Sequence, residues 1–175
     1  LGAQAIGEEA VDKRIDVLAT AIAGKMTVFD LENLDLAYSP PFGAANDPVN
    51  IAGFVAANLL KGDVRNINWH EFIDIEPEGI ELIDLRNKDE LEEAGVVAGA
   101  LHIPLPELRS RLNELDPHKQ YITFCAIGLR GYVAYRIMSQ KGFDVQNLSG
   151  GYKTLMGAKG KIMAESARTQ LWRSE

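Results

Sequence analysis

Cysteine is almost absent from this chain, since Cys125 is the only one among 175 residues. A single cysteine cannot form an internal disulfide, so folding does not depend on an oxidising compartment and we expect a cytoplasmic protein. Long apolar runs are absent too, and none approaches the roughly 20 residues that a membrane-spanning helix needs. The chain therefore predicts neither a membrane span nor a secreted disulfide framework.

Basic side chains are outnumbered, with 18 Lys and Arg against 25 Asp and Glu, a net charge of −7 and a pI near 5.0. This balance argues against a nucleic-acid partner or an anionic membrane surface, because both require basic patches. A local anion site stays open, since a few oriented backbone amides can form one. No metal site is expected. The composition is 46% hydrophobic and 25% charged, which is typical of a globular protein.

The N-terminal third has a mainly helical pattern. Apolar residues recur at helical spacing over residues 8–24, and a second short pattern covers residues 27–36. Asp47 and Pro48 have the preferred chemistry of an N-cap and first helical position, and predict a helix over residues 49–61. This segment is small for an independent core. It is either a helical cap on the rest of the chain or, as we favour, the remnant of a larger domain.

The remainder of the chain alternates strands with helices, which predicts an α/β fold with a central parallel sheet flanked by helices. We expect one domain at residues 1–63 and a second at 64–175. The expected strands of the second domain are at residues 80–85, 100–103, 121–124 and 144–148, and its helices at 87–93, 105–115, 132–141 and 152–172.

Cys125 directly follows an apolar strand and precedes a tight loop that leads into a helix. A thiol at this position faces backbone N–H groups and the positive end of the helix dipole, and both favour the reactive thiolate. We therefore predict that Cys125 is a nucleophile. The predicted anion-binding loop consists of Ala126, Ile127, Gly128, Leu129, Arg130 and Gly131. Taken alone, one cysteine is more often a small buried hydrophobic residue.

The loop length discriminates between two chemistries. Cysteine phosphatases of related fold use Cys-x5-Arg, usually after a histidine, whereas here four residues separate Cys125 from Arg130 and Phe124 comes before the cysteine. The shorter loop suits a single sulfur better than a phosphate group. Arg130 either adds positive charge at the rim of this site or forms a surface ion pair.

Four motifs in order resemble the rhodanese family of sulfurtransferases, over about residues 66–155. Along the chain they are a strand ending in Asp84-x-Arg86, the Gly-Ala-x-x-Ile-Pro segment at residues 99–104, the cysteine loop that begins at Cys125, and the Gly-Gly turn at residues 150–151. The resemblance implies a rhodanese-like fold and a persulfide on Cys125. It also implies that Asp84 and Arg86 organise the end of the sheet and that His102 is a framework residue.

Residues 11–22, 38–43 and 47–50 are similar to the end of the dimerisation domain of flavin-dependent pyridine nucleotide-disulfide oxidoreductases. The similar branch is that of the coenzyme A-disulfide or persulfide reductases, some of which carry a C-terminal rhodanese domain. This resemblance implies a cut piece of a longer homodimeric protein with upstream flavin and NADH domains, using FAD, NADH and coenzyme A. This piece lacks a Gly-x-Gly-x-x-Gly fingerprint and should bind neither FAD nor NADH.

The same resemblance implies that Tyr38 reaches the disulfide site of the longer protein across its dimer interface. The alternative is an ordinary loop tyrosine that packs on Pro40 and Pro41.

Three functions remain open from the sequence. The first is sulfur transfer through a Cys125 persulfide, from a sulfane-sulfur donor to a thiol acceptor such as coenzyme A. The second is a non-catalytic docking or dimerisation module of rhodanese fold. The third, which the loop spacing disfavours, is a phosphate or arsenate enzyme on the same scaffold.

Overall fold

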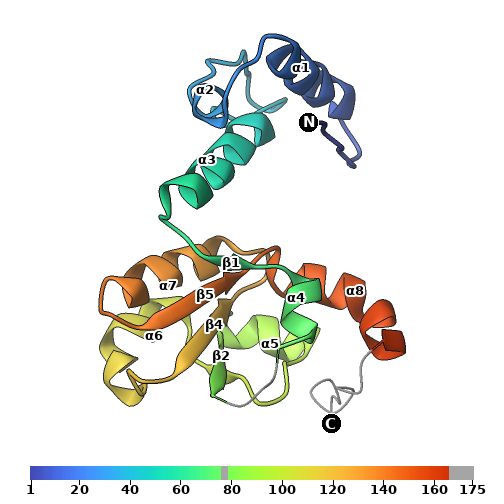
Figure 1. The fold of residues 1–175 in the computed structure, drawn as a ribbon. Helices are drawn as coiled ribbons and strands as arrows, with labels where there is room; N and C mark the ends of the chain where they lie inside the picture. Colours follow the sequence, from blue (N-terminus) through green and yellow to red (C-terminus); the bar gives the residue numbers. More distant parts are fainter. Residues whose placement is uncertain (76–78, 166–175) are drawn as a thin grey trace. The chain divides into compact units, whose positions relative to one another are not determined.

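The computed structural model of the chain describes residues 1–75 and 79–165, with side chains through residue 158. The chain divides into two compact units, Leu1–Asp63 and Val64–Glu175. Figure 1 shows the two units in the colours of the sequence. Within the described residues, no helix combines the length and the apolar character required to cross a membrane.

The first unit contains α1 (Val11–Ala23), α2 (Val28–Glu32) and α3 (Pro48–Lys61). The helix expected from residue 8 begins only at Val11, because Ala10 takes a left-handed conformation with φ 52° that a continuing helix does not allow. The helical pattern expected over residues 27–36 forms only the short α2. Asn33 follows α2 outside helical geometry, and its side chain donates to the Phe29 carbonyl.

Buried polar contacts hold the first unit together. Asp47 caps α3 and also pairs with Arg14 of α1, with 3.0 Å between Nη2 and Oδ2. The side-chain amide of Asn50 donates to the carbonyls of Leu31 and Leu34, 3.2 and 2.8 Å away, and so joins α3 to the segment around α2. These contacts replace part of the apolar core that a unit of this size lacks.

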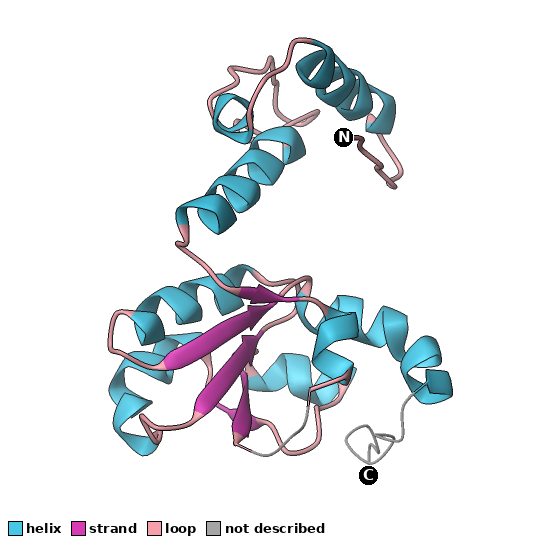
Figure 2. Cartoon of the chain, viewed as in Figure 1, coloured by secondary structure: helices cyan, strands magenta, loops and turns pink. Residues whose placement is uncertain are grey.

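The second unit is an α/β domain whose sheet, within the described residues, has five parallel strands in the order β1-β5-β4-β2-β3. Figure 2 shows these strands in magenta between helices. The strands are β1 (Asn66–Ile67), β2 (Ile80–Asp84), β3 (Leu101–His102), β4 (Gln120–Phe124) and β5 (Asp144–Leu148). The helices are α4 (Trp69–Ile73), α5 (Lys88–Ala94), α6 (Leu105–Arg111) with a 3-10 turn at Leu112–Glu114, α7 (Leu129–Ser139) and α8 (Gly151–Glu165).

Both faces of the sheet are buried, which explains the continuous apolar runs of its strands. One face packs Ile83 and Tyr121 against α6 and α7. The other packs Ile122 and Phe124 against residues of α4 and α8. Because successive strand residues point to opposite faces, β4 supplies both cores, and Cys125 continues the row of Tyr121.

The α/β expectation with a central parallel sheet is confirmed, and several boundaries differ. β1 and α4 were absent from the sequence prediction, and they are short elements of two and five residues. The predicted helix at residues 132–141 begins at Leu129 instead. The predicted final helix at 152–172 begins at Gly151, and its part beyond residue 165 lies outside the described residues.

Candidate active site

Cys125 lies at the carboxyl end of β4, the middle strand of the sheet. Ligands of open α/β sheets bind beyond the carboxyl ends of the strands. The Cys125 side chain is fully buried, with 0% of its surface exposed, and belongs to the core cluster on the α6 and α7 face. Its Sγ accepts a hydrogen bond from the Gly128 backbone N–H at 3.2 Å. A backbone donor therefore already points at the sulfur.

The loop itself is shorter than the sequence predicted. Only residues 126–128 are irregular, since Leu129, Arg130 and Gly131 form the first turn of α7. Gly128 allows this early start, because its φ of 113° is favourable only for glycine, and its carbonyl accepts the first helical bond from Tyr132. The start of α7 thus lies three residues nearer to Cys125 than expected, which strengthens the dipole argument for an anion at the sulfur.

The Gly150-Gly151 turn supports the loop from behind. The N–H groups of Tyr152 and Lys153 donate to the carbonyls of Cys125 and Ala126, at 2.8 and 3.0 Å. Gly151 has φ 57°, and a Cβ added there would collide with the Cys125 carbonyl oxygen and lie 3.0 Å from the Ile127 nitrogen. The first turn of α8 therefore fixes the backbone positions of Cys125 and Ala126.

Arg130 forms an ion pair with Glu90 of α5, as one of the two sequence interpretations allowed. Its two terminal nitrogens donate to the two carboxylate oxygens of Glu90, each at 2.6 Å. The hydrogen bonds from Arg130 lower the pKa of Glu90 to about 2. The pKa of Arg130 is raised, first by its hydrogen bonds to Glu90 and to a smaller extent by the nearby Cys125 sulfur. Arg130 therefore lies close to the sulfur while its charge is matched by Glu90.

The lowered pKa makes a testable statement about pH. Because this pKa belongs to the folded state, the pair stabilises the fold fully above the ordinary value of 4.5, and the contribution is lost as the pH falls towards about 2. We expect an NMR titration of the Glu90 carboxyl to show this low value in the intact chain. In the control variant Arg130→Gln the pKa should return towards 4.5. A Glu90 carboxyl that titrates at its ordinary value in the intact chain would contradict the geometry.

Asp84 and Arg86 lie together at the end of β2, 2% and 1% exposed. Arg86 Nε and Nη2 donate to both oxygens of Asp84, at 2.6 to 3.1 Å, and Nη2 also donates to the Gly95 carbonyl. The guanidinium carbon lies 3.8 Å from the ring centroid of Tyr152, a cation–π geometry. The buried pair thus supports α8 at Tyr152, whose own backbone N–H holds the Cys125 carbonyl, so we assign Asp84 and Arg86 a positioning role.

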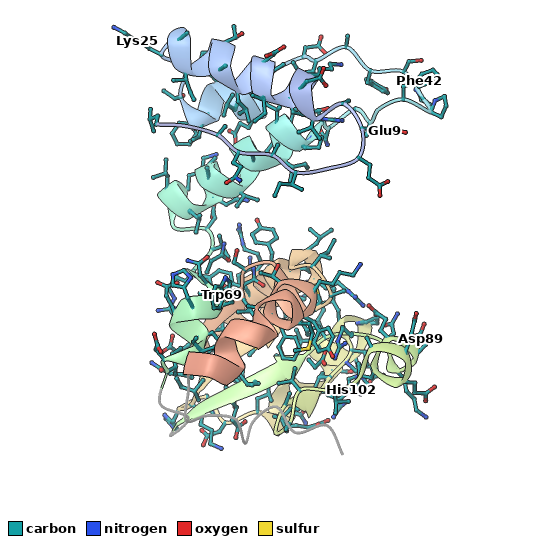
Figure 3. The ribbon with its side chains drawn as sticks, turned by 90° about the vertical axis from the view of Figure 1, so that its right-hand side faces the viewer. Glu9, Lys25, Phe42, Trp69, Asp89 and His102 are labelled. Atoms are coloured by element: carbon teal, nitrogen blue, oxygen red, sulfur yellow. The ribbon has the colours of Figure 1, made fainter. Side chains whose placement is uncertain are left out.

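Two apolar side chains form the exposed rim of the loop. Ile127 is 64% exposed and Leu129 is 68% exposed. His102 Nε2 donates a hydrogen bond to the Arg86 carbonyl oxygen at 2.8 Å, and Figure 3 labels this side chain. It contacts the framework, as the sequence led us to expect.

Tyr38 belongs to the first unit, where it is 54% exposed. It lines a cavity of about 280 Å³ together with Lys13, Arg14 and Phe42. Its proposed part in a longer protein remains a prediction.

Glu90 and Tyr152 were missed by the sequence prediction. Glu90 carries one available signal, because Asn87-x-x-Glu90 is a capping box and the Asn87 N–H does donate to the carboxylate at 2.9 Å. A capping box does not indicate which cation the carboxylate will meet. For Tyr152 the only sequence signal is its position after two glycines, because its partners Arg86 and Ala94 are distant in the sequence.

The second unit is thus an α/β domain with a parallel sheet and a cysteine at the end of the middle strand. A short loop that contains Gly128 follows the cysteine and leads directly into a helix. The family of the Rhodanese-like domain matches residues 68–158, slightly more than half of the chain, and the chain belongs to this family.

Curated relatives of this chain are much longer proteins. The chain resembles coenzyme A disulfide reductases of Staphylococcus aureus strain RF122, 45% identical over 56 residues, and Staphylococcus haemolyticus, 42% over 59 residues. These matches cover 32% and 34% of this chain but only 13% of each relative. The chain thus spans a small part of the length of these relatives.

Two solved structures are similar over most of the chain. Reduced CoADR-RHD of Bacillus anthracis is 44% identical to this chain, with a TM-score of 0.80. The match covers 89% of this chain and 27% of the Bacillus anthracis chain. A NAD-dependent persulfide reductase from A. fulgidus is 43% identical to this chain, with a TM-score of 0.71. The match covers 83% of this chain and 26% of the A. fulgidus chain. Both matches are longer than either unit and so extend into both.

Proposed function

We propose that this chain transfers sulfane sulfur through a persulfide on Cys125, as the C-terminal module of an FAD- and NADH-dependent coenzyme A-disulfide or persulfide reductase. The observation that carries the proposal is the sulfur of Cys125 at the end of β4, with the Gly128 N–H directed at it and the start of α7 beside it. Membership in the rhodanese-like family supports the same reaction class.

The transfer takes place in two balanced steps. The Cys125 thiolate attacks the outer sulfur of the donor, the new S–S bond forms, and the donor's own S–S bond breaks as its electron pair leaves with sulfite or a thiolate. An acceptor thiolate then attacks the terminal sulfur, and the Cys125 thiolate leaves. The Gly128 N–H and the α7 dipole stabilise negative charge on the sulfur in both steps. Because Cys125 is buried, the loop residues must shift for a donor to reach it.

A mass spectrum of the 175-residue chain tests the persulfide. Incubation with thiosulfate or an organic persulfide should add the mass of one sulfur atom, and a reducing thiol should remove it. The Cys125→Ser variant should show no addition, because a hydroxyl at this position cannot form the persulfide. Failure of the unchanged chain to gain sulfur from either donor would refute the proposed activity.

The place of the module in a longer reductase rests on the first unit. The two similar reductase structures match both units, and their printed names concern coenzyme A disulfide and persulfide reduction. We propose that residues 1–63 are the end of the dimerisation domain of such a homodimeric reductase, and that coenzyme A is the thiol acceptor. A reading frame that continues upstream of Leu1 with Gly-x-Gly-x-x-Gly motifs and a second redox cysteine would support this assignment, and a frame without them would oppose it.

The alternative is a non-catalytic docking module, and one observation favours it. Cys125 is fully buried and packs with the core, as an inert cysteine would. The rate of Cys125 alkylation as a function of pH separates the two functions. A thiol that reacts only under alkaline conditions, like a free cysteine, would favour the docking module.

A further inference from the structure

The charge of the cysteine loop is cancelled by a residue outside it. Arg130 is the one charged side chain among residues 125–131. Both of its terminal nitrogens donate to Glu90, and the two side chains are only 26% and 28% exposed. Two short parallel hydrogen bonds in a partly buried site are the strong form of this ion pair. The positive charge of Arg130 is therefore matched by the Glu90 carboxylate before any second anion binds.

Glu90 is itself held in place. Its Oε2 accepts the Asn87 N–H of the capping box at 2.9 Å, while the same carboxylate receives Arg130. Rotating Glu90 away from Arg130 would give up the ion pair and disturb the cap at the start of α5. The neutral Arg130–Glu90 pair is thus a fixed feature of the site.

The donors of a persulfide site differ in charge. The loop amide and the helix start can balance one negative charge on the transferred sulfur. Thiosulfate carries a second negative charge on its sulfonate oxygens, which requires a cation that is not already paired. An organic donor carries an apolar group instead, and the exposed rim residues Ile127 and Leu129 offer apolar surface to such a group.

We propose that Glu90 determines donor specificity by neutralising Arg130, so that the Cys125 loop favours singly charged donors with an organic arm over the doubly charged inorganic donor thiosulfate. This inference rests on the proposed sulfur transfer. In either case the Cys125 thiolate attacks the outer sulfur of the donor and the S–S bond of the donor breaks. The electron pair leaves with a sulfinate, a thiolate or, from thiosulfate, with sulfite.

Methanethiosulfonate and thiosulfate are matched probes, because they differ only by a methyl group in place of one anionic oxygen. The measurement is the second-order rate constant of Cys125 persulfide formation with each donor, followed by mass spectrometry, at fixed ionic strength. In the unchanged chain methanethiosulfonate should react faster. Glu90→Gln should lower the methanethiosulfonate-to-thiosulfate ratio about tenfold, because the Arg130 charge becomes available to the dianion.

Glu90→Gln keeps an oxygen that can accept the Asn87 N–H, so the helix cap is preserved. Asp89→Asn is the matched control, since Asp89 is an exposed carboxylate on the same turn, labelled in Figure 3. It removes the same charge from α5 outside the ion pair, and should change the ratio less than about twofold. The double variant Glu90→Gln, Arg130→Gln should lose the gain of thiosulfate reactivity, because the freed cation is gone.

The outcomes are distinct. A Glu90→Gln variant that slows both donors equally, with an unchanged ratio, would show a merely structural role and overturn the inference while leaving the proposed function intact. An equal change with Asp89→Asn would also overturn it, because any charge on α5 would then serve. Absence of a persulfide with both donors in the unchanged chain would overturn the proposed function and this inference together.

Discussion

Replacing Gly151 with alanine is expected to reduce persulfide formation at Cys125 by about 100-fold, the effect of displacing a reacting atom by roughly 1 Å. The added Cβ would collide with the Cys125 carbonyl oxygen and lie 3.0 and 3.1 Å from the Ile127 nitrogen and the Ala126 carbonyl carbon. These are backbone atoms, so the loop must move. The positive φ of Gly151 adds strain for any other residue. The rate of persulfide formation with a saturating donor measures the effect.

Gly157→Ala in the same helix is the matched control. Gly157 has open space around it and no positive φ. Alanine there should leave sulfur transfer unchanged and stabilise the chain by up to about 1 kcal/mol, because alanine favours helix more than glycine does. If Gly151→Ala transfers sulfur at the rate of Gly157→Ala, then the α8 turn does not position Cys125.

The second large effect is expected at the buried ion pair. Asp84→Asn should lower the free energy of unfolding by about 3–5 kcal/mol, because it leaves the Arg86 guanidinium buried without its counter-charge. Arg86 is only 1% exposed, and within the described residues its Nη1 already has no hydrogen-bond partner. Urea unfolding followed by tryptophan fluorescence reports on the second unit, because Trp69 and Trp172 both come after residue 63.

Glu92→Gln provides the exposed counterpart. Glu92 pairs with Lys88 at 3.7 Å on α5, and the two side chains are 68% and 85% exposed. Loss of such a pair should cost less than about 0.5 kcal/mol, because solvent screens it. A cost for Asp84→Asn as small as that for Glu92→Gln would show that Arg86 gains solvent or another partner when Asp84 is changed.

Much of the candidate site could be predicted from local sequence. The apolar run before Cys125 specifies a buried strand, and Gly128 permits the turn that follows. Asp84 and Arg86 are two residues apart, so their proximity to one another is local. The parallel arrangement then follows from the alternation of strands and helices.

The start of α7 was predicted three residues late, for a local reason. A glycine within the first turn of a helix normally lowers helix propensity, and Gly131 therefore suggested a continuing loop. In the structure Gly131 is buried against Asn147 of β5, where a Cβ would not fit. Packing against a distant strand, rather than propensity, decides that position.

The sequence by itself determined the α/β class, the position of Cys125 at a strand end, and the four-residue spacing from Cys125 to Arg130 on which the proposed sulfur chemistry rests. These properties depend on residues near one another in the chain, where periodicity and turn chemistry act. Only the tertiary structure decided the pairing of Arg130 with Glu90, the stacking of Arg86 on Tyr152 and the complete burial of Cys125. Each of these depends on the strand order of the sheet, which brings together segments that are 40 residues apart for Glu90 and Arg130 and 66 residues apart for Arg86 and Tyr152.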